Sequence, residues 1–166
     1  GKECSTQQMP FISEKIPTFE EFANASIEEI YGEEIIDAYE RKVTSFESII
    51  LINKGENKFE IEKLPPLAQS IPILTSDSYD INEDGYEDVI VGGNIYNTEV
   101  ETPRLDNQFA VILISDKNKN YSTIGPDKSG LYLSGNTKSL KIIDRKNPKL
   151  LVANNNSNLE VFELNK

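Results

Sequence analysis

The chain changes its pattern of hydrophobic and polar positions near Thr44. Before that point, short apolar stretches stand among acidic residues and helix-capping signals. After it, short runs of Ile, Val, Leu and Phe are separated by turns rich in Asn, Asp, Gly and Lys, which is typical of β-strands. We therefore predict a helical segment over residues 1–43 and a mainly β, antiparallel region over residues 44–166.

The N-terminal segment carries two capping boxes. Thr18 precedes Glu21 by three positions, and Ser26 precedes Glu29 in the same way, with Gly32 placed to end the second helix. The next stretch, EEIIDAYERK, has acids first and bases last, which suits the helix dipole. This pattern predicts two or three short helices, which cap or cover another part of the protein.

Nine short stretches after Thr44 fit the strand pattern, and no sustained helical period interrupts them. They are FESIILIN, KFEIEKL, IPILTSD, DVIVGG, FAVILIS, YSTIG, LKIID, KLLVAN and LEVFEL.

Two pieces of this region recur at nearly one period. FESIILINKGENKF resembles FAVILISDKNKNY, and VIVGGN resembles LLVANN. The matched positions are Phe46 with Phe109 and Asn53 with Asp116 (63 apart), Phe59 with Tyr121 (62 apart), and Val89 with Leu150 (61 apart). A period of roughly 60 residues with four strands in each unit is typical of stacked sheets or propeller blades.

The predicted units are one full blade over 70–125 and two partial blades over 44–64 and 139–164. The fold class is therefore mainly β, with antiparallel propeller-type blades and a short helical N-terminal segment. A closed propeller needs about four blades or more. Because about two are predicted here, we expect the chain to be the C-terminal piece of a larger propeller.

Composition narrows the chemistry. The chain has 17 basic and 28 acidic residues and a formal net charge of −11, which disfavours nucleic acid and anionic membranes and favours cations. It has no histidine and a single cysteine, Cys4, so Ser-His-Asp and Cys-His triads and an internal disulfide are excluded. No apolar run approaches the roughly 20 residues of a membrane-spanning helix. We expect no membrane insertion, and any export signal would lie outside this sequence.

The segment from Asp77 to Asp88 contains six acidic residues, counting both ends, and leads directly into an apolar strand. Within this segment, oxygen-bearing side chains follow the spacing Asp-x-Asn-x-Asp-Gly-x-x-Asp, which can coil around a hard cation such as calcium. An EF-hand is rejected because its twelfth position would be Val91, inside a strand. The alternative is a solvated turn. The predicted ligands are Asp80, Asn82, Asp84, the backbone carbonyl of Tyr86, and Asp88.

The remaining acids of this segment, Asp77, Glu83 and Glu87, do not fit the ligand spacing, and we interpret them as solvated or outer-shell charge. The corresponding later loop, Asp144 to Lys149, keeps one acid and gains three bases. We expect it to bind no metal, which leaves one calcium ion for the chain.

The stretch YDINEDGYEDVIVGGN is similar to the FG-GAP, or VCBS, repeat. Further segments resemble the C-terminal part of the ASPIC/UnbV-type (cartilage acidic protein-like) group, namely ECSTQQMPFISEKIPTFEEFANASIEEIYG, LPPLAQSIP, GNIYNTEVETPRLDN, SGLYLSGNTKSL and LLVANNNSNLEVFEL. The resemblance covers nearly the whole chain. It implies a secreted or surface-attached bacterial β-propeller, of the kind found in Bacteroidetes-type bacteria, and the same calcium ligands.

The long segment Gly93 to Asn107 joins two predicted strands of the full blade. Its polar residues make it a candidate ligand-binding rim, because long loops on rigid sheets carry recognition. The alternative interpretation is an ion pair between Arg104 and a carboxylate that orders the loop. The candidate ligand-binding residues are Tyr96, Glu99, Glu101 and Arg104.

Two hypotheses for function follow. The first is a non-catalytic, calcium-stabilised module for binding or adhesion at the cell surface or in the periplasm, with a protein or glycan ligand. The second is a carbohydrate-active enzyme, or a subunit of one, that uses a carboxylate pair. The lack of histidine, of a reactive cysteine and of a phosphate-binding motif favours the first. Unpaired strand edges also predict self-association.

Overall fold

The structure is a computed structural model that describes residues 1–164, except for the side chain of Glu34. The chain divides into two compact units, Gly1–Ser45 and Phe46–Lys166. The sequence pattern placed this boundary after residue 43. Each unit has its own buried residues.

The first unit is helical. It contains α1 (Lys2–Gln8), α2 (Phe11–Lys15), α3 (Phe19–Asn24), α4 (Ile27–Tyr31) and the 3-10 helix η1 (Gly32–Asp37). Both predicted capping boxes are confirmed, at Thr18 and at Ser26. Because each helix is shorter than about 12 residues, it depends on packing, and the buried residues Ile12, Ile16 and Ile30 supply that packing.

The stretch EEIIDAYERK, whose charges suit a helix, is helical only in its first half. Only η1 forms there, and Ala38, which follows it, already has an extended backbone with ψ of 140°. Residues 38–48 have no regular secondary structure. Favourable end charges contribute only about 0.3–1 kcal/mol, and the exposed side chains of residues 38–47 give no apolar face to pack.

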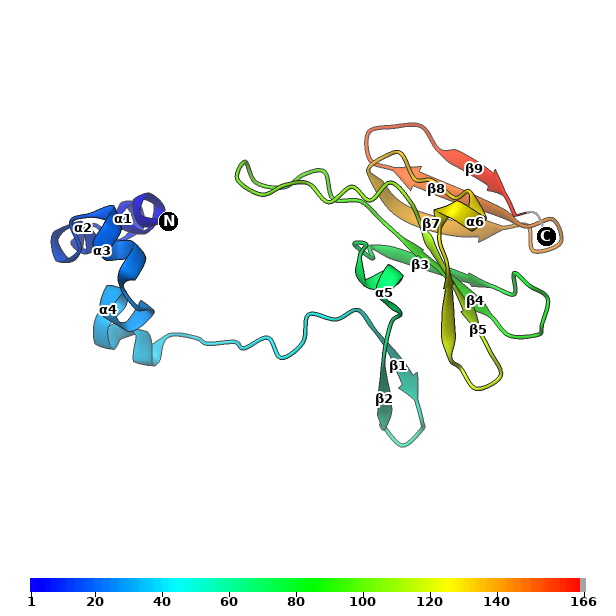
Figure 1. Cartoon of the computed structure of the whole chain (residues 1–166), viewed down its shortest axis with the longest axis horizontal. Coiled ribbons are helices and arrows are strands. Elements are labelled where there is room, and N and C mark those ends of the chain that lie inside the picture. Colours follow the sequence, from blue (N-terminus) through cyan, green and yellow to red (C-terminus); the bar gives the residue numbers. More distant parts are fainter. Residues whose placement is uncertain (165–166) are drawn as a thin grey trace. The chain divides into compact units, whose positions relative to one another are not determined.

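The second unit consists of antiparallel sheets, so the prediction of a mainly β chain is confirmed. The first sheet pairs β1 (Ile49–Asn53) with β2 (Phe59–Lys63). The second has the order β3 (Thr75–Tyr79), β4 (Asp88–Gly92), β5 (Val111–Ser115) and β6 (Tyr121–Ile124). The third has the order β7 (Thr137–Ile143), β8 (Lys149–Asn154) and β9 (Glu160–Glu163) (Figure 1). Within the described residues these sheets stay separate and open, without closure into a ring.

The second sheet is covered on both faces because its strands are apolar at consecutive positions. Its one face, with Ile90 and Ile112, packs against Leu140, Leu150 and Val152 of the third sheet. Its other face packs against the segment that follows the first hairpin. The cluster on this other face contains Val91, Val111 and Leu113 of the second sheet and Leu64, Ala68 and Ile71 of the covering segment, with Ile50 of β1 packed beside them.

The β1–β2 and β5–β6 hairpins have the same pairing. Asn53 lies opposite Phe59, and Ser115 lies opposite Tyr121, in each case 62 residues further along the chain. The turn contact from Lys54 N–H to the Lys58 carbonyl likewise matches that from Asp116 to Asn120. The structural correspondence therefore pairs Asn53 with Ser115, one residue before the Asp116 chosen from the sequence.

Two short helices interrupt the β region and were not predicted. They are α5 (Pro66–Gln69) and α6 (Pro126–Ser129), each with a proline in its first turn. Four residues are too few to show a helical period, although proline at the helix start was a readable signal.

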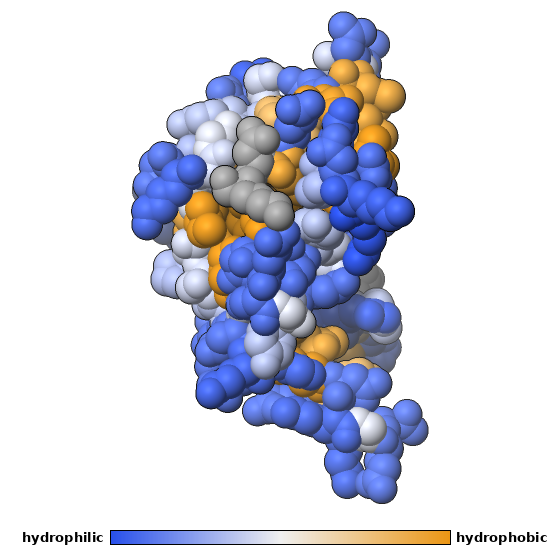
Figure 2. Space-filling model, turned by 90° about the vertical axis from the view of Figure 1, so that its right-hand side faces the viewer, coloured by the Kyte–Doolittle hydropathy of each residue, from blue (hydrophilic) through white to orange (hydrophobic). Residues whose placement is uncertain are grey.

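No helix among the described residues is both long and apolar enough to cross a bilayer. On the side of the molecule drawn in Figure 2, hydrophilic residues predominate and apolar side chains emerge in separate small patches.

Candidate functional site

The predicted calcium loop connects β3 to β4. The Asp80 carboxylate accepts the N–H groups of Asp84 at 3.0 Å and Gly85 at 2.9 Å, and Asp84 accepts the N–H of Tyr86 at 2.9 Å. Asn82 accepts the same Asp84 N–H at 3.2 Å. Gly85 has a φ of +89°, which favours glycine. The side-chain oxygens thus fold the loop back on itself.

Asp88 is the one predicted ligand that is completely buried. It begins β4, and its Oδ2 accepts the N–H of Ile81 at 3.0 Å while its Oδ1 accepts the N–H of Ser115 at 2.9 Å. No lysine or arginine of the described residues forms an ion pair with it. A buried carboxylate without a counter-charge is costly unless a cation or further hydrogen bonds compensate it.

The donor set fits a hard cation. It consists only of carboxylate, amide and carbonyl oxygens, which are the ligands that calcium takes. Within the described residues, no three or more carboxylates, histidines or cysteines stand in a ready metal-binding group. The carboxylates of Asp80 and Asp84 instead accept backbone N–H groups of the loop.

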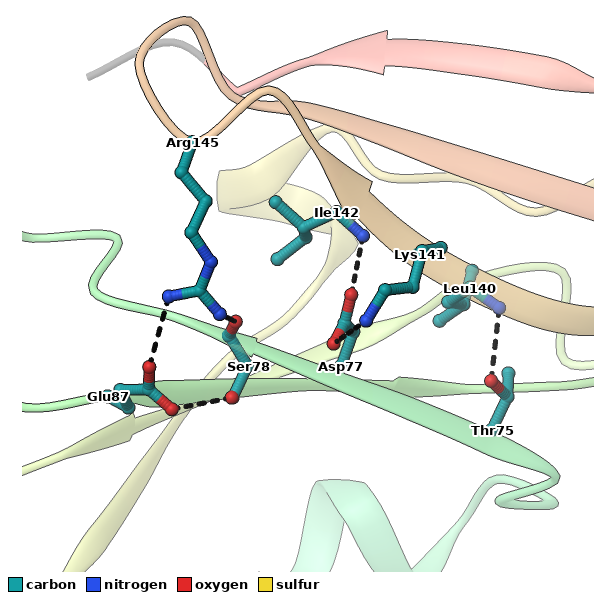
Figure 3. Close-up of polar contacts among 8 residues, drawn as sticks. All are labelled: Thr75, Asp77, Ser78, Glu87, Leu140, Lys141, Ile142 and Arg145. Carbon is teal, nitrogen blue, oxygen red and sulfur yellow. Dashed lines mark hydrogen bonds and ion pairs between the residues drawn. The ribbon is translucent and has the colours of Figure 1, made fainter.

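Asp77 is not a solvated charge, which corrects the sequence interpretation. Its side chain is 13% exposed and forms an ion pair with Lys141 at 3.0 Å, and it also accepts the backbone N–H of Ile142. Thr75, two residues earlier on β3, accepts the N–H of Leu140 at 3.0 Å. Two side chains of β3 therefore bind backbone groups of β7, and the second and third sheets are joined (Figure 3).

Glu87 also joins the two sheets, although its side chain is 58% exposed and in this respect agrees with the prediction of a solvated acid. It accepts the hydroxyl of Ser78 at 2.6 Å and pairs with Arg145 at 3.3 Å (Figure 3). Arg145 comes from the loop between β7 and β8, and its carbonyl accepts the hydroxyl of Tyr79 at 3.3 Å. The acids that flank the ligand spacing thus hold the neighbouring sheet.

These contacts shift two pKa values. Burial raises the pKa of Asp77, but hydrogen bonds from Ile142 N–H and Lys141 outweigh it and leave that pKa below its ordinary value. Hydrogen bonds from Ser78 and then Arg145 lower the pKa of Glu87. Both carboxylates are therefore held in their charged form.

The loop between β7 and β8 has a different arrangement. Asp144 has a φ of +49° and accepts the N–H groups of Lys146 at 3.3 Å and Asn147 at 3.4 Å. It is a tight turn with a single acid and basic neighbours.

The long segment Gly93 to Asn107 extends from the sheets as an arm (Figure 1). Ile95 and Leu105 pair across its base, and Arg104 pairs with Asp106 at 2.7 Å while lying 4.7 Å from the ring centre of Tyr96. The structure therefore brings Tyr96 and Arg104 together. It contains the ion pair of the alternative interpretation, although the Arg104 side chain is 56% exposed.

The other two candidate residues lie near the tip of the arm. Glu99 accepts the hydroxyl of Thr102 at 2.8 Å, and Glu101 is exposed. Between them Val100 is fully exposed. The four candidates thus divide into a pair near the base and a pair at the tip.

Sequence reasoning missed Asn94, which anchors the arm. It is fully buried, and its amide donates to the carbonyls of Leu133 at 3.1 Å and Gly135 at 2.7 Å. Its Oδ1 is the buried side-chain oxygen without a hydrogen-bond partner among the described residues. The only signal was its position directly after the Gly-Gly pair that ends the strand.

No protein-family model matches the chain, and comparisons with curated proteins and with solved structures found no match. The resemblance of the motifs to FG-GAP repeats and to the ASPIC/UnbV-type group therefore stays a prediction.

Proposed function

We propose that the β region is a non-catalytic binding module that a calcium ion stabilises, and that its sheets are blades of a larger FG-GAP-type propeller at the cell surface or in the periplasm. One observation carries this proposal. Asp88, the last residue of the ligand spacing, is fully buried at the start of a core strand and has no basic partner among the described residues. A cation held by Asp80, Asn82, Asp84, Tyr86 and Asp88 would neutralise it.

A calcium ion in this loop would act on the fold. Asp88 touches both the loop, through Ile81, and β5, through Ser115. Holding the carboxylate therefore fixes the connection between β3 and β4 relative to β5. The same strand β4 leads into the arm, so its base at Asn94 and Ile95 would be held in one position.

Recognition by the arm is the use that this arrangement supports best. Tyr96, Glu99, Glu101 and Arg104 are its candidate residues for a protein or glycan ligand. The enzyme hypothesis gains no support from the acids nearest the loop. Asp77 and Glu87 are both occupied by contacts to the third sheet.

The test of calcium binding is the melting temperature of the full chain in calcium and in EDTA. Calcium at a hundredfold excess over its Kd should add about 2.7 kcal/mol to the free energy of unfolding. Asp84→Ala should abolish that increase. Asp144→Ala, which removes an acid from the loop between β7 and β8, is the matched control and should leave the increase intact.

Equal melting temperatures in calcium and EDTA, together with no bound ion in elemental analysis, would reject the calcium proposal. The proposal of a non-catalytic module would be rejected if the chain cleaves a polysaccharide and a single Asp or Glu substitution outside the calcium loop stops that cleavage. For binding, a glycan and matrix-protein panel is screened with and without calcium. Ligand capture should weaken in Tyr96→Ala and Arg104→Ala at an unchanged melting temperature.

A further inference from the structure

The outer edge of β1 has unpaired backbone groups. Ser48 accepts the N–H of Leu64 at 3.1 Å, and Lys54 donates to Lys58 at 2.9 Å. Because hydrogen-bonded pairs alternate along an antiparallel ladder, the N–H and C=O groups of Ile49 and Leu51 point away from β2. Only β2 pairs with β1 in the described chain.

An apolar groove lies beside this edge. It has a volume of about 400 Å³, and its lining includes Ile49 and Ile50 of β1 and Val89, Val91 and Leu113 of the second sheet. A two-stranded hairpin alone is marginally stable. The groove and the unpaired strand edge therefore lie at the same place.

The second sheet shows what fills the equivalent place. The β5–β6 hairpin corresponds to β1–β2 with a shift of 62 residues, from Asn53 to Ser115 and from Phe59 to Tyr121. There, β4 pairs with the outer edge of β5, opposite Val111 and Leu113.

Burial differs sharply between the two places. Val111 and Leu113 are 0% and 1% exposed, whereas their counterparts Ile49 and Leu51 are 40% and 56% exposed. Val111 and Leu113 are buried because Leu64, Ala68 and Ile71 pack in the same cluster, whereas Ile49 and Leu51 belong to no buried cluster of the described residues. The layer that would cover this face of β1 is therefore absent from the described chain.

We propose that the outer edge of β1 and the groove beside it accept an antiparallel strand of the β4 type, supplied by another β-layer outside these 166 residues. The residues of Gly1–Ser45 cannot supply it as they stand, because the described part of that unit contains no strand.

The strand has a defined chemistry. In the second sheet, Asp88 caps the N–H of Ser115, and Val89, Ile90 and Val91 then pair with β5. The incoming strand accordingly carries a carboxylate that accepts the backbone N–H of Asn53, the counterpart of Ser115. Three aliphatic residues follow that carboxylate. The middle one, opposite Ile50, enters the groove.

The test uses the full chain labelled with nitrogen-15 and a synthetic peptide with the sequence of residues 86–93, YEDVIVGG. At about ten times its Kd, the peptide should slow amide exchange at Ile49 and Leu51 by about tenfold. Leu51→Pro removes an N–H from the outer edge of β1 and should abolish the effect. Ile61→Pro, the matched control, removes an N–H from the outer edge of β2 and should preserve it.

A peptide with Ile90→Asp should fail to protect either residue. Protection at Ile61 or on β9 instead of β1, or no protection at any peptide concentration, would overturn the proposal. The result is independent of calcium and of the Gly93 to Asn107 arm, since neither contributes a residue to this edge. The inference rests on the proposed blade architecture, but failure of calcium binding or of ligand capture by the arm leaves it standing.

Discussion

Asp77 and Asp88 belong to the same acidic segment, yet they act in different places. Asp88 binds backbone N–H groups within its own sheet, whereas Asp77 binds β7 of the next sheet. The turn geometry around Asp80 and Asp84 follows from local spacing, so the sequence could indicate it. The role of Asp77 depends on a residue 65 positions away, which no local pattern reports.

At this scale we expect Asp77→Asn to destabilise the β region by about 1–3 kcal/mol at neutral pH, because the buried N–H of Ile142 loses a charged acceptor. The lowered pKa fixes the pH dependence. The contribution is complete above the unfolded-state pKa of about 3.9 and is lost as pH falls through the folded-state pKa. Denaturant unfolding of both proteins between neutral and acidic pH measures it.

The matched control is Glu56→Gln, an exposed carboxylate in a hairpin turn whose side chain is 84% exposed. Its effect should be within about 0.5 kcal/mol at every pH. A difference between wild type and Asp77→Asn that persists unchanged in strong acid would contradict the charge-based explanation.

At the scale of elements, sequence patterns located the strands and both capping boxes, because these depend on a few neighbouring residues. The charge pattern predicted a helix beyond η1, but the chain is extended from Ala38, because the following residues have no apolar face to bury. The sequence patterns also located the arm without identifying its anchor. Asn94 is polar and follows a glycine pair, so its complete burial depends on contacts with residues 133 to 135.

We expect the arm to be anchored at Asn94 and only weakly by Arg104. Asn94→Ala should destabilise the β region by about 1–3 kcal/mol, because the buried carbonyl of Leu133 and the half-buried carbonyl of Gly135 lose their donor. Arg104→Ala should change the free energy of unfolding by less than about 1 kcal/mol, since exposed ion pairs contribute little. Chemical denaturation measures both variants, and a larger loss from Arg104→Ala than from Asn94→Ala would show that the Arg104–Asp106 pair orders the arm.

At the scale of the whole molecule, residues 38–48, which connect the two units along the chain, have no regular secondary structure. Arg41 and Lys42 are exposed there. We expect limited trypsin digestion to cut first after one of these residues, because local disorder of the backbone governs cleavage. Mass spectrometry identifies the fragment, and its calcium-dependent melting should equal that of the full chain. First cleavage inside the β region would contradict this division.

The outward face of the first hairpin and the net charge act in opposite directions on self-association. Leu51 and Ile61 lie opposite each other on that face and are 56% and 65% exposed. A charge of −11 keeps copies apart, but salt screens it over about 8 Å at physiological ionic strength.

We therefore expect light scattering to show a mass that grows with protein concentration and with added salt. Leu51→Lys and Ile61→Lys should each reduce this growth, because they place a charge at the centre of the apolar face. Val100→Lys is the control, since Val100 is even more exposed but lies at the tip of the arm, away from any strand edge. A monomer at all salt concentrations, or an equal effect of Val100→Lys, would show that the hairpin face does not drive association.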